Sequence, residues 1–249
     1  MPLDSAPVPR LDLLLARSSG LGRRAATRAI RAGRLTRHDG TPWTDAKERV
    51  PPSHLPLTVR LDGEPLVLRE HVHVLQHKPA GVVTARSDRR HATAYELLAG
   101  APLHRHLRAV GRLDLDTTGL LLWTTDGTWV HRLAHPKYGI ERTYEALLDR
   151  PPAPCPEDLV LDDGHRPEIR RIETVPDEKA HPGLLRPAPG PVCRIVLVGG
   201  KFHEVKRIFA ALGSRVLALC RTAYGPWRLP VTLPAGGWVE IDRRAGPGA

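Results

Sequence analysis

Apolar residues recur at helical spacing twice near the start of the chain. They predict a first helix over residues 10–17, ended by Ser18-Ser19-Gly20, and a second helix over 22–32, ended by Gly33. The apolar positions are Leu11, Leu14 and Leu15 in the first helix and Ala26, Ala29 and Ile30 in the second. Residues 34–37 then predict a strand that ends in a tight turn. This first part of the chain is therefore expected to be a small helical and β unit.

The pattern changes after a proline-rich linker that starts at residues 51–56. Residues 72–75 alternate as a strand does, and residues 93–98 predict a short helix with Thr93 as its N-cap. A later helix is predicted from four apolar positions at helical spacing, Val205, Ile208, Phe209 and Leu212. Two proline-rich stretches, 151–156 and 182–191, predict surface loops and not domain boundaries.

Basic residues cover the polar side of the second predicted helix. Arg24, Arg28 and Arg31 repeat at i, i+4 and i+7 opposite the apolar face, and residues 10–40 hold eight arginines against two acids. Such a face could be a solvated surface, but like charges at this spacing repel unless an anion neutralises them. A phosphate backbone is the expected anion. The candidate RNA-binding residues are Arg23, Arg24, Arg28, Arg31 and Arg34.

The composition favours a polyanionic partner. The 249 residues carry 37 Lys+Arg against 27 Asp+Glu, a net charge of +10 with a pI of about 10.1. This excess suits nucleic acid or an anionic membrane surface, although solubility alone would explain it equally well. Three cysteines without C-x-x-C spacing predict reduced thiols and no zinc site. Without an apparent signal peptide or an apolar run of roughly 20 residues, a cytoplasmic protein that contacts no membrane is expected.

The segment 111–122, Gly-Arg-Leu-Asp-Leu-Asp-Thr-Thr-Gly-Leu-Leu-Leu, is the strongest candidate for chemistry. It places Arg112 and Asp114 directly before a turn and an apolar run. A carboxylate against an apolar wall is poised for reaction, because desolvation raises its free energy unless a cation pairs with it. The segment resembles the catalytic loop of RNA pseudouridine synthases, which implies that Asp114 is the nucleophile.

Four further segments carry the same resemblance, in the same order as in the family. They are Lys78-Pro79-Ala80-Gly81-Val82-Val83-Thr84, residues 135–144 ending in Tyr144, residues 199–213 with Lys206, and residues 219–226 with Arg221. The family has Gln where this chain has Glu204, which puts any polar contact of that side chain in doubt. Residues 10–60 resemble the S4 RNA-binding domain. The match spans nearly the whole chain.

The resemblance implies an α+β protein in two domains. An S4-like domain over residues 9–60 would precede a catalytic domain over 61–249 with a bent, largely antiparallel mixed sheet and flanking helices. Tyr144 would stack on the target base, and Lys206 would pair with Asp114. Arg112 would occupy the space that a flipped base leaves, or hold phosphate, or form a structural salt bridge. The expected substrate-binding residues are Arg112, Arg207 and Arg221.

The implied reaction converts uridine to pseudouridine in ribosomal RNA, and the string Lys-Phe-His-Glu-Val-Lys-Arg at 201–207 favours 16S over 23S RNA. Because the reaction is an isomerisation, no cofactor or metal is expected. The expected partner is ribosomal RNA or a subunit assembly intermediate, bound by a monomer. Attack of Asp114 on C1′ and a glycal route both stay open. Two alternatives are an inactive RNA-binding assembly factor and a hydrolase with Asp114 and Asp116 as its carboxylate pair. In the second case Asp116 is better explained as the cap of the turn at 117–119.

Overall fold

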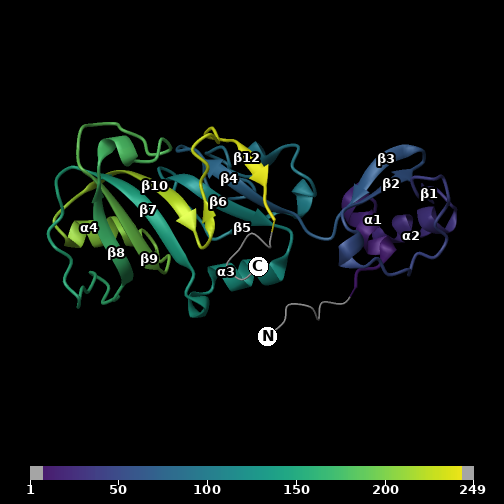
Figure 1. Cartoon of the computed structure of the whole chain (residues 1–249), viewed down its shortest axis with the longest axis horizontal. Coiled ribbons are helices and arrows are strands. Elements are labelled where there is room, and N and C mark those ends of the chain that lie inside the picture. Colours follow the sequence, from purple (N-terminus) through teal and green to yellow (C-terminus); the bar gives the residue numbers. More distant parts are fainter. Residues whose placement is uncertain (1–7, 243–249) are drawn as a thin grey trace. The chain divides into compact units, whose positions relative to one another are not determined.

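The structure is a computed structural model that describes residues 8–242. It divides into two compact units (Figure 1). The first holds the chain up to Val72 together with Ala101–His106, and the second holds His73–Gly100 and the chain from Leu107 onward. The predicted boundary at residue 60 is too early, because the strand that follows it completes the sheet of the first unit.

The first unit packs two helices with a three-stranded antiparallel sheet of order β1-β2-β3. Its elements are α1 (Leu11–Ser19), α2 (Arg23–Arg31), β1 (Leu35–Thr36), η1 (Pro52–His54), β2 (Leu57–Leu61), β3 (Glu64–Leu68) and η3 (His104–His106). The apolar faces predicted for both helices are buried in one core with Val59 and Leu68 of the sheet. The two predicted helices, the strand at Leu35 and the terminating Gly33, at φ +69°, are thereby confirmed.

The second unit is built on a nine-stranded sheet whose main path runs β12-β4-β6-β10-β7-β9-β8, with β5 beside β6 and β11 beside β10. The strands are β4 (His73–Lys78), β5 (Arg108–Val110), β6 (Thr118–Thr124), β7 (Glu141–Leu148), β8 (Glu168–Val175), β9 (Val192–Val198), β10 (Val216–Tyr224), β11 (Trp227–Arg228) and β12 (Trp238–Glu240). The helices are η2 (Glu96–Leu98), α3 (Gly127–Ala134), η4 (Pro136–Tyr138), η5 (Asp177–Lys179) and α4 (Glu204–Ala211). Helix α3 contacts β5 and β6, and α4 contacts β10 (Figure 1). This unit is therefore α+β with a largely antiparallel mixed sheet, as expected.

One parallel pair, β6 with β10, lies in the middle of the antiparallel sheet. Gly119 on β6 has φ +108°, and a Cβ built there would lie 2.3 Å from the backbone oxygen of Arg221 on β10. Only glycine allows this approach. The pairing places the start of β6 beside Arg221, and Arg221 is in turn the register partner of Tyr144 on β7. Residues far apart in the sequence thereby meet at the centre of the sheet.

The local predictions in the second unit are largely confirmed. The strand expected at 72–75 is β4, and the helix expected from Val205 is α4. The helix expected at 93–98 is shorter than predicted, because η2 begins at Glu96 with Tyr95 as its N-cap. Thr93 still exchanges two hydrogen bonds with Glu96 in the manner of a capping box, from Glu96 N to Thr93 Oγ1 and from Thr93 N to Glu96 Oε2. The segment 182–191 is a mostly exposed loop, as predicted, except that Gly183 and Leu184 are buried against the sheet.

Candidate active site

The loop that carries Asp114 and Asp116 joins β5 to β6 and is held by neighbouring backbone and side chains. The hydroxyl of Thr84 accepts from the amide of Leu113 at 3.1 Å and donates to its carbonyl at 3.0 Å. The amide of Gly81 donates to the carbonyl of Leu115 at 2.8 Å. The segment Lys78–Thr84 therefore fixes the backbone on both sides of Asp114, whose side chain remains 32% exposed.

Lys206 on α4 reaches both carboxylates of this loop. Its Nζ lies 3.4 Å from Asp114 Oδ2 and donates to Asp116 at 2.7 and 2.9 Å. The expected approach of Lys206 to Asp114 is present, but its shorter contacts are to Asp116. Burial tends to raise the pKa of Asp116, yet the hydrogen bonds and charge of Lys206 bring that pKa below its ordinary value. Asp116 was expected to cap the following turn; its carboxylate instead pairs with Lys206.

Two further basic side chains near Asp114 were not among the predicted site residues. His203 Nε2 lies 3.6 Å from Asp114 Oδ2. Lys78, the last residue of β4, is fully buried, and its Nζ donates to the carbonyls of Pro79 at 2.9 Å and Thr117 at 2.8 Å. Burial lowers the pKa of Lys78 to about 8, although the charges of nearby Asp116 and Asp114 oppose this. The available signal for Lys78 was its place in the Lys-Pro string at the end of this strand.

Tyr144 and Arg221 lie together in the sheet behind this loop. Arg221 Nε donates to the carbonyl of Leu120 at 2.8 Å, and its Nη1 lies 3.4 Å from the hydroxyl of Tyr144. Tyr144 is 8% exposed and Arg221 only 2%. Arg221 was predicted to bind substrate, but its burial leaves no surface for direct contact. It supports Tyr144 from the interior of the protein.

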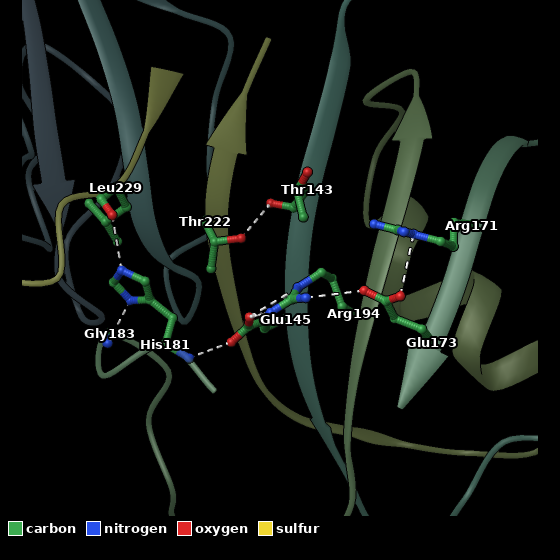
Figure 2. Close-up of polar contacts among 9 residues, drawn as sticks. All are labelled: Thr143, Glu145, Arg171, Glu173, His181, Gly183, Arg194, Thr222 and Leu229. Atoms are coloured by element: carbon green, nitrogen blue, oxygen red, sulfur yellow. Dashed lines mark hydrogen bonds and ion pairs between the residues drawn. The ribbon is translucent and has the colours of Figure 1, made fainter. Parts of the chain in front are cut away.

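A buried carboxylate braces the strand that carries Tyr144. Glu145 accepts from Arg194 on β9 at 2.8 Å and from the amide of His181 at 2.6 Å (Figure 2). The loop that carries His181 also contacts β6, because the carbonyl of Gly183 accepts from the hydroxyl of Thr118 at 2.8 Å. This network links Tyr144's strand to the first residue after the Asp114 loop. It explains why the loop 182–191 is partly buried.

Arg207, the next residue after Lys206, is half-buried, and its guanidinium is already paired with two carboxylates. Its guanidinium pairs with Asp162, at 2.8 Å through Nε, and with Asp163 at 2.6 Å. The hydrogen bonds from Arg207 and from the backbone of His165 lower the pKa of Asp163 to about 2. In this structure the charge of Arg207 is already neutralised by the protein itself.

Glu204, the departure from the family Gln, is buried at the start of α4. It accepts from the amide of Lys201 at 3.0 Å and lies 2.7 Å from His165 Nε2. Both carboxylate oxygens are thus used in holding the loop before α4 and the turn around His165. The acid therefore serves local structure here and does not contact Asp114.

The arginines predicted to contact RNA differ in how far they are engaged. Arg112 is exposed, and no ion pair joins it to a described residue, which disfavours the structural salt bridge. Arg24, Arg28 and Arg31 are likewise exposed on α2 without an ion pair in the described part of the chain. In contrast, Arg34 pairs with Asp62, and Arg23 lies 3.5 Å from Asp12. Three adjacent arginines of α2 are therefore available to an external anion.

Within residues 8–242 no group of three His, Cys, Asp or Glu side chains is arranged to hold a metal ion. Over the same range, no helix has the length and apolar character needed to cross a membrane. The three cysteines are free, and burial raises the pKa of Cys220 to about 12.

Comparison with known proteins agrees with this geometry. Residues 72–211 match the family described as RNA pseudouridylate synthase. The ribosomal small subunit pseudouridine synthase A of Salmonella typhimurium is 35% identical over 93% of this chain and 96% of its own length, and the Escherichia coli protein of that name is 34% identical over the same shares. A solved pseudouridylate synthase, 29% identical, superimposes with a TM-score of 0.58 over 94% of this chain and 96% of its own. The chain therefore belongs to the RNA pseudouridylate synthase family.

Proposed function

We propose that this protein converts a uridine of small-subunit (16S) ribosomal RNA to pseudouridine. The observation that carries the reaction class is Asp114, held on a braced loop with the Lys206 ammonium 3.4 Å away. The target is supported by relatives named ribosomal small subunit pseudouridine synthase A, which match along nearly the whole chain. Such a substrate places the protein in the cytoplasm with the ribosome or an assembling subunit.

The chemistry follows from the residue types. The N1–C1′ bond breaks, the uracil rotates, a C5–C1′ bond forms, and the proton leaves C5 while N1 gains one. Asp114 must be ionised, whether it attacks C1′ or removes the C2′ proton, and the ammonium of Lys206 lies 3.4 Å from its carboxylate. In this proposal Tyr144 stacks on the base and helps to remove the C5 proton. Atoms balance within one nucleotide, so the reaction consumes no second substrate.

The three arginines predicted to bind substrate, all in the second unit, have different roles in this proposal. Arg112, exposed two residues before Asp114, either occupies the space left by the flipped uridine or binds a phosphate. Arg221 acts as a positioning residue through Tyr144. Arg207 would bind RNA only after leaving Asp162 and Asp163, so it is the weakest of the three substrate-binding candidates.

The first unit serves as the S4 RNA-binding domain in this proposal. Its two helices, its short sheet and the exposed face of Arg24, Arg28 and Arg31 support that role. Phosphate binding by these side chains would supply affinity without reading sequence.

Mapping pseudouridine in ribosomal RNA from a deletion strain tests the proposal. One 16S position should lose the modification and regain it when the wild-type gene is restored. Loss at a 23S position instead would overturn the choice of target. Asp114→Asn should fail to restore the modification, with RNA affinity within a few-fold of wild type. If Asp114→Asn keeps more than about a tenth of wild-type turnover, the assignment of the nucleophile is wrong, since losing such a group costs orders of magnitude.

A further inference from the structure

Phe202 is an exposed aromatic side chain close to the candidate nucleophile. It lies in the loop between β9 and α4 and is 71% exposed, more than any other large apolar side chain in the described part of the chain. An exposed phenyl ring leaves apolar area in contact with water, a free-energy cost that burial elsewhere would have removed. Its neighbours in sequence, Lys201, His203 and Glu204, are polar, so Phe202 is a single exposed ring within its own segment.

The ring of Phe202 stacks on that of His203. Their centroids are 3.7 Å apart and their planes differ by 19°. His203 has φ 51° and ψ 27°, a left-handed conformation that residues other than glycine rarely adopt and that clusters at functional sites. The same imidazole lies 3.6 Å from Asp114 Oδ2. His203 thus stands between Phe202 and Asp114, and since it covers one face of the phenyl ring, the large exposed area belongs to the opposite face and the edge.

We propose that Phe202, backed by His203, is a stacking platform for an unpaired base of the substrate RNA next to the target uridine. This inference rests on the proposed function. A uridine that leaves its stack exposes the faces of its neighbours, which then need a new apolar surface. An aromatic ring provides one for any base, because every base has a π face. A lone ring among charged residues fits a base inside a polyanion better than it fits an apolar protein surface, which would need a contiguous patch.

The test compares three variants with the wild-type enzyme on the RNA that it modifies. Phe202→Ala should weaken RNA binding by about 5- to 150-fold, the range expected for one lost base stack. Its turnover at saturating RNA should stay within a few-fold of wild type, because the Asp114–Lys206 contact is untouched. Phe202→Trp should bind as tightly as wild type. Val231→Ala, a truncation at a 68% exposed apolar position of the same unit, should change nothing.

Abasic substitution identifies the contact. RNAs that lack the base on one side or the other of the target uridine are bound to wild type and to Phe202→Ala. If the missing base is the one that stacks on Phe202, wild type should bind that abasic RNA no more tightly than Phe202→Ala does. A merely structural role of Phe202 would leave the ratio of the two affinities the same on every RNA.

Three results would overturn the platform: wild-type affinity in Phe202→Ala, an affinity ratio unchanged by both abasic RNAs, or a loss confined to turnover at saturation. Matching circular dichroism spectra and thermal midpoints would show that the variants are folded. Failure of the proposed function is distinct, since wild type would then form no pseudouridine in 16S or 23S RNA.

Discussion

Replacing Lys78 by Met should lower turnover strongly while changing the free energy of unfolding only a little at pH 7. The substitution keeps an unbranched buried side chain but removes the ammonium that donates to the carbonyls of Pro79 and Thr117. Leaving the buried carbonyl of Thr117 and the half-buried carbonyl of Pro79 without this donor costs up to about 1–3 kcal/mol each. Opposing this, a lysine pKa near 8 instead of 10.5 means that burying the charged form costs about 3 kcal/mol at neutral pH. The net loss of stability at pH 7 should therefore be small, while turnover falls by more than tenfold because the loop is no longer held.

The difference in stability between wild type and Lys78→Met should grow with pH. The pKa of Lys78 is lower in the folded protein than in the unfolded chain, so between pH 8 and 10.5 the unfolded chain binds the extra proton. The unfolding free energy of wild type therefore rises with pH in that window, and the Met variant lacks this contribution. Between pH 7 and 9.5 the difference should widen by about 2 kcal/mol, since one pKa unit corresponds to about 1.4 kcal/mol.

Urea unfolding of both proteins at pH 7, 8 and 9.5 measures this difference. Tryptophan fluorescence reports mainly the second unit, because four of the five tryptophans lie there. Other titrating groups are common to both proteins and cancel. A stability difference that is flat across this range would refute the burial of a charged Lys78. Wild-type turnover in Lys78→Met would show that the hydrogen bonds of Lys78 to the loop carrying Asp114 do not matter for the reaction.

Two other perturbations test the charged residues of each unit. Lys206→Met should lower turnover on the order of 10- to 1000-fold, because Asp114 and Asp116 lose their shared cation. Lys206→Arg should be milder, and wild-type turnover in Lys206→Met would refute the pairing. Changing Arg24, Arg28 and Arg31 together to Ser should weaken RNA binding and reduce the slope of log K against log salt by roughly 0.7 for each lost contact to single-stranded RNA, with turnover at saturation unchanged. An unchanged slope in the triple variant would mean that this face is only solvated.

Local patterns along the chain were enough to predict several elements and the family. The helices of the first unit follow from apolar spacing at Leu11 and Ala26, because a helix must bury one face wherever it packs. The capping role of Thr93 follows from the residues next to it. Asp114 and Lys206 were predicted as site residues because the motifs that hold them resemble motifs of the family, and a motif can be read from the sequence alone.

Distances and burial, in contrast, were decided by the tertiary structure. The choice of Asp116 as the shorter partner of Lys206 depends on how α4 meets the loop before β6, some 90 residues away in the chain. Arg221 was expected to bind substrate, yet it lies on β10 beside β6 in the interior of the sheet. Arg207 meets Asp162 and Asp163 only because the loop before β8 folds back over α4.

The physical reason is that a motif specifies which groups are present and how they are spaced locally, whereas charge state and accessibility depend on everything that packs around them. Lys78 illustrates both sides. Its place in a Lys-Pro string marked the residue from sequence, but only the sheet around it removes it from water and directs its ammonium to the carbonyls of the loop that carries Asp114.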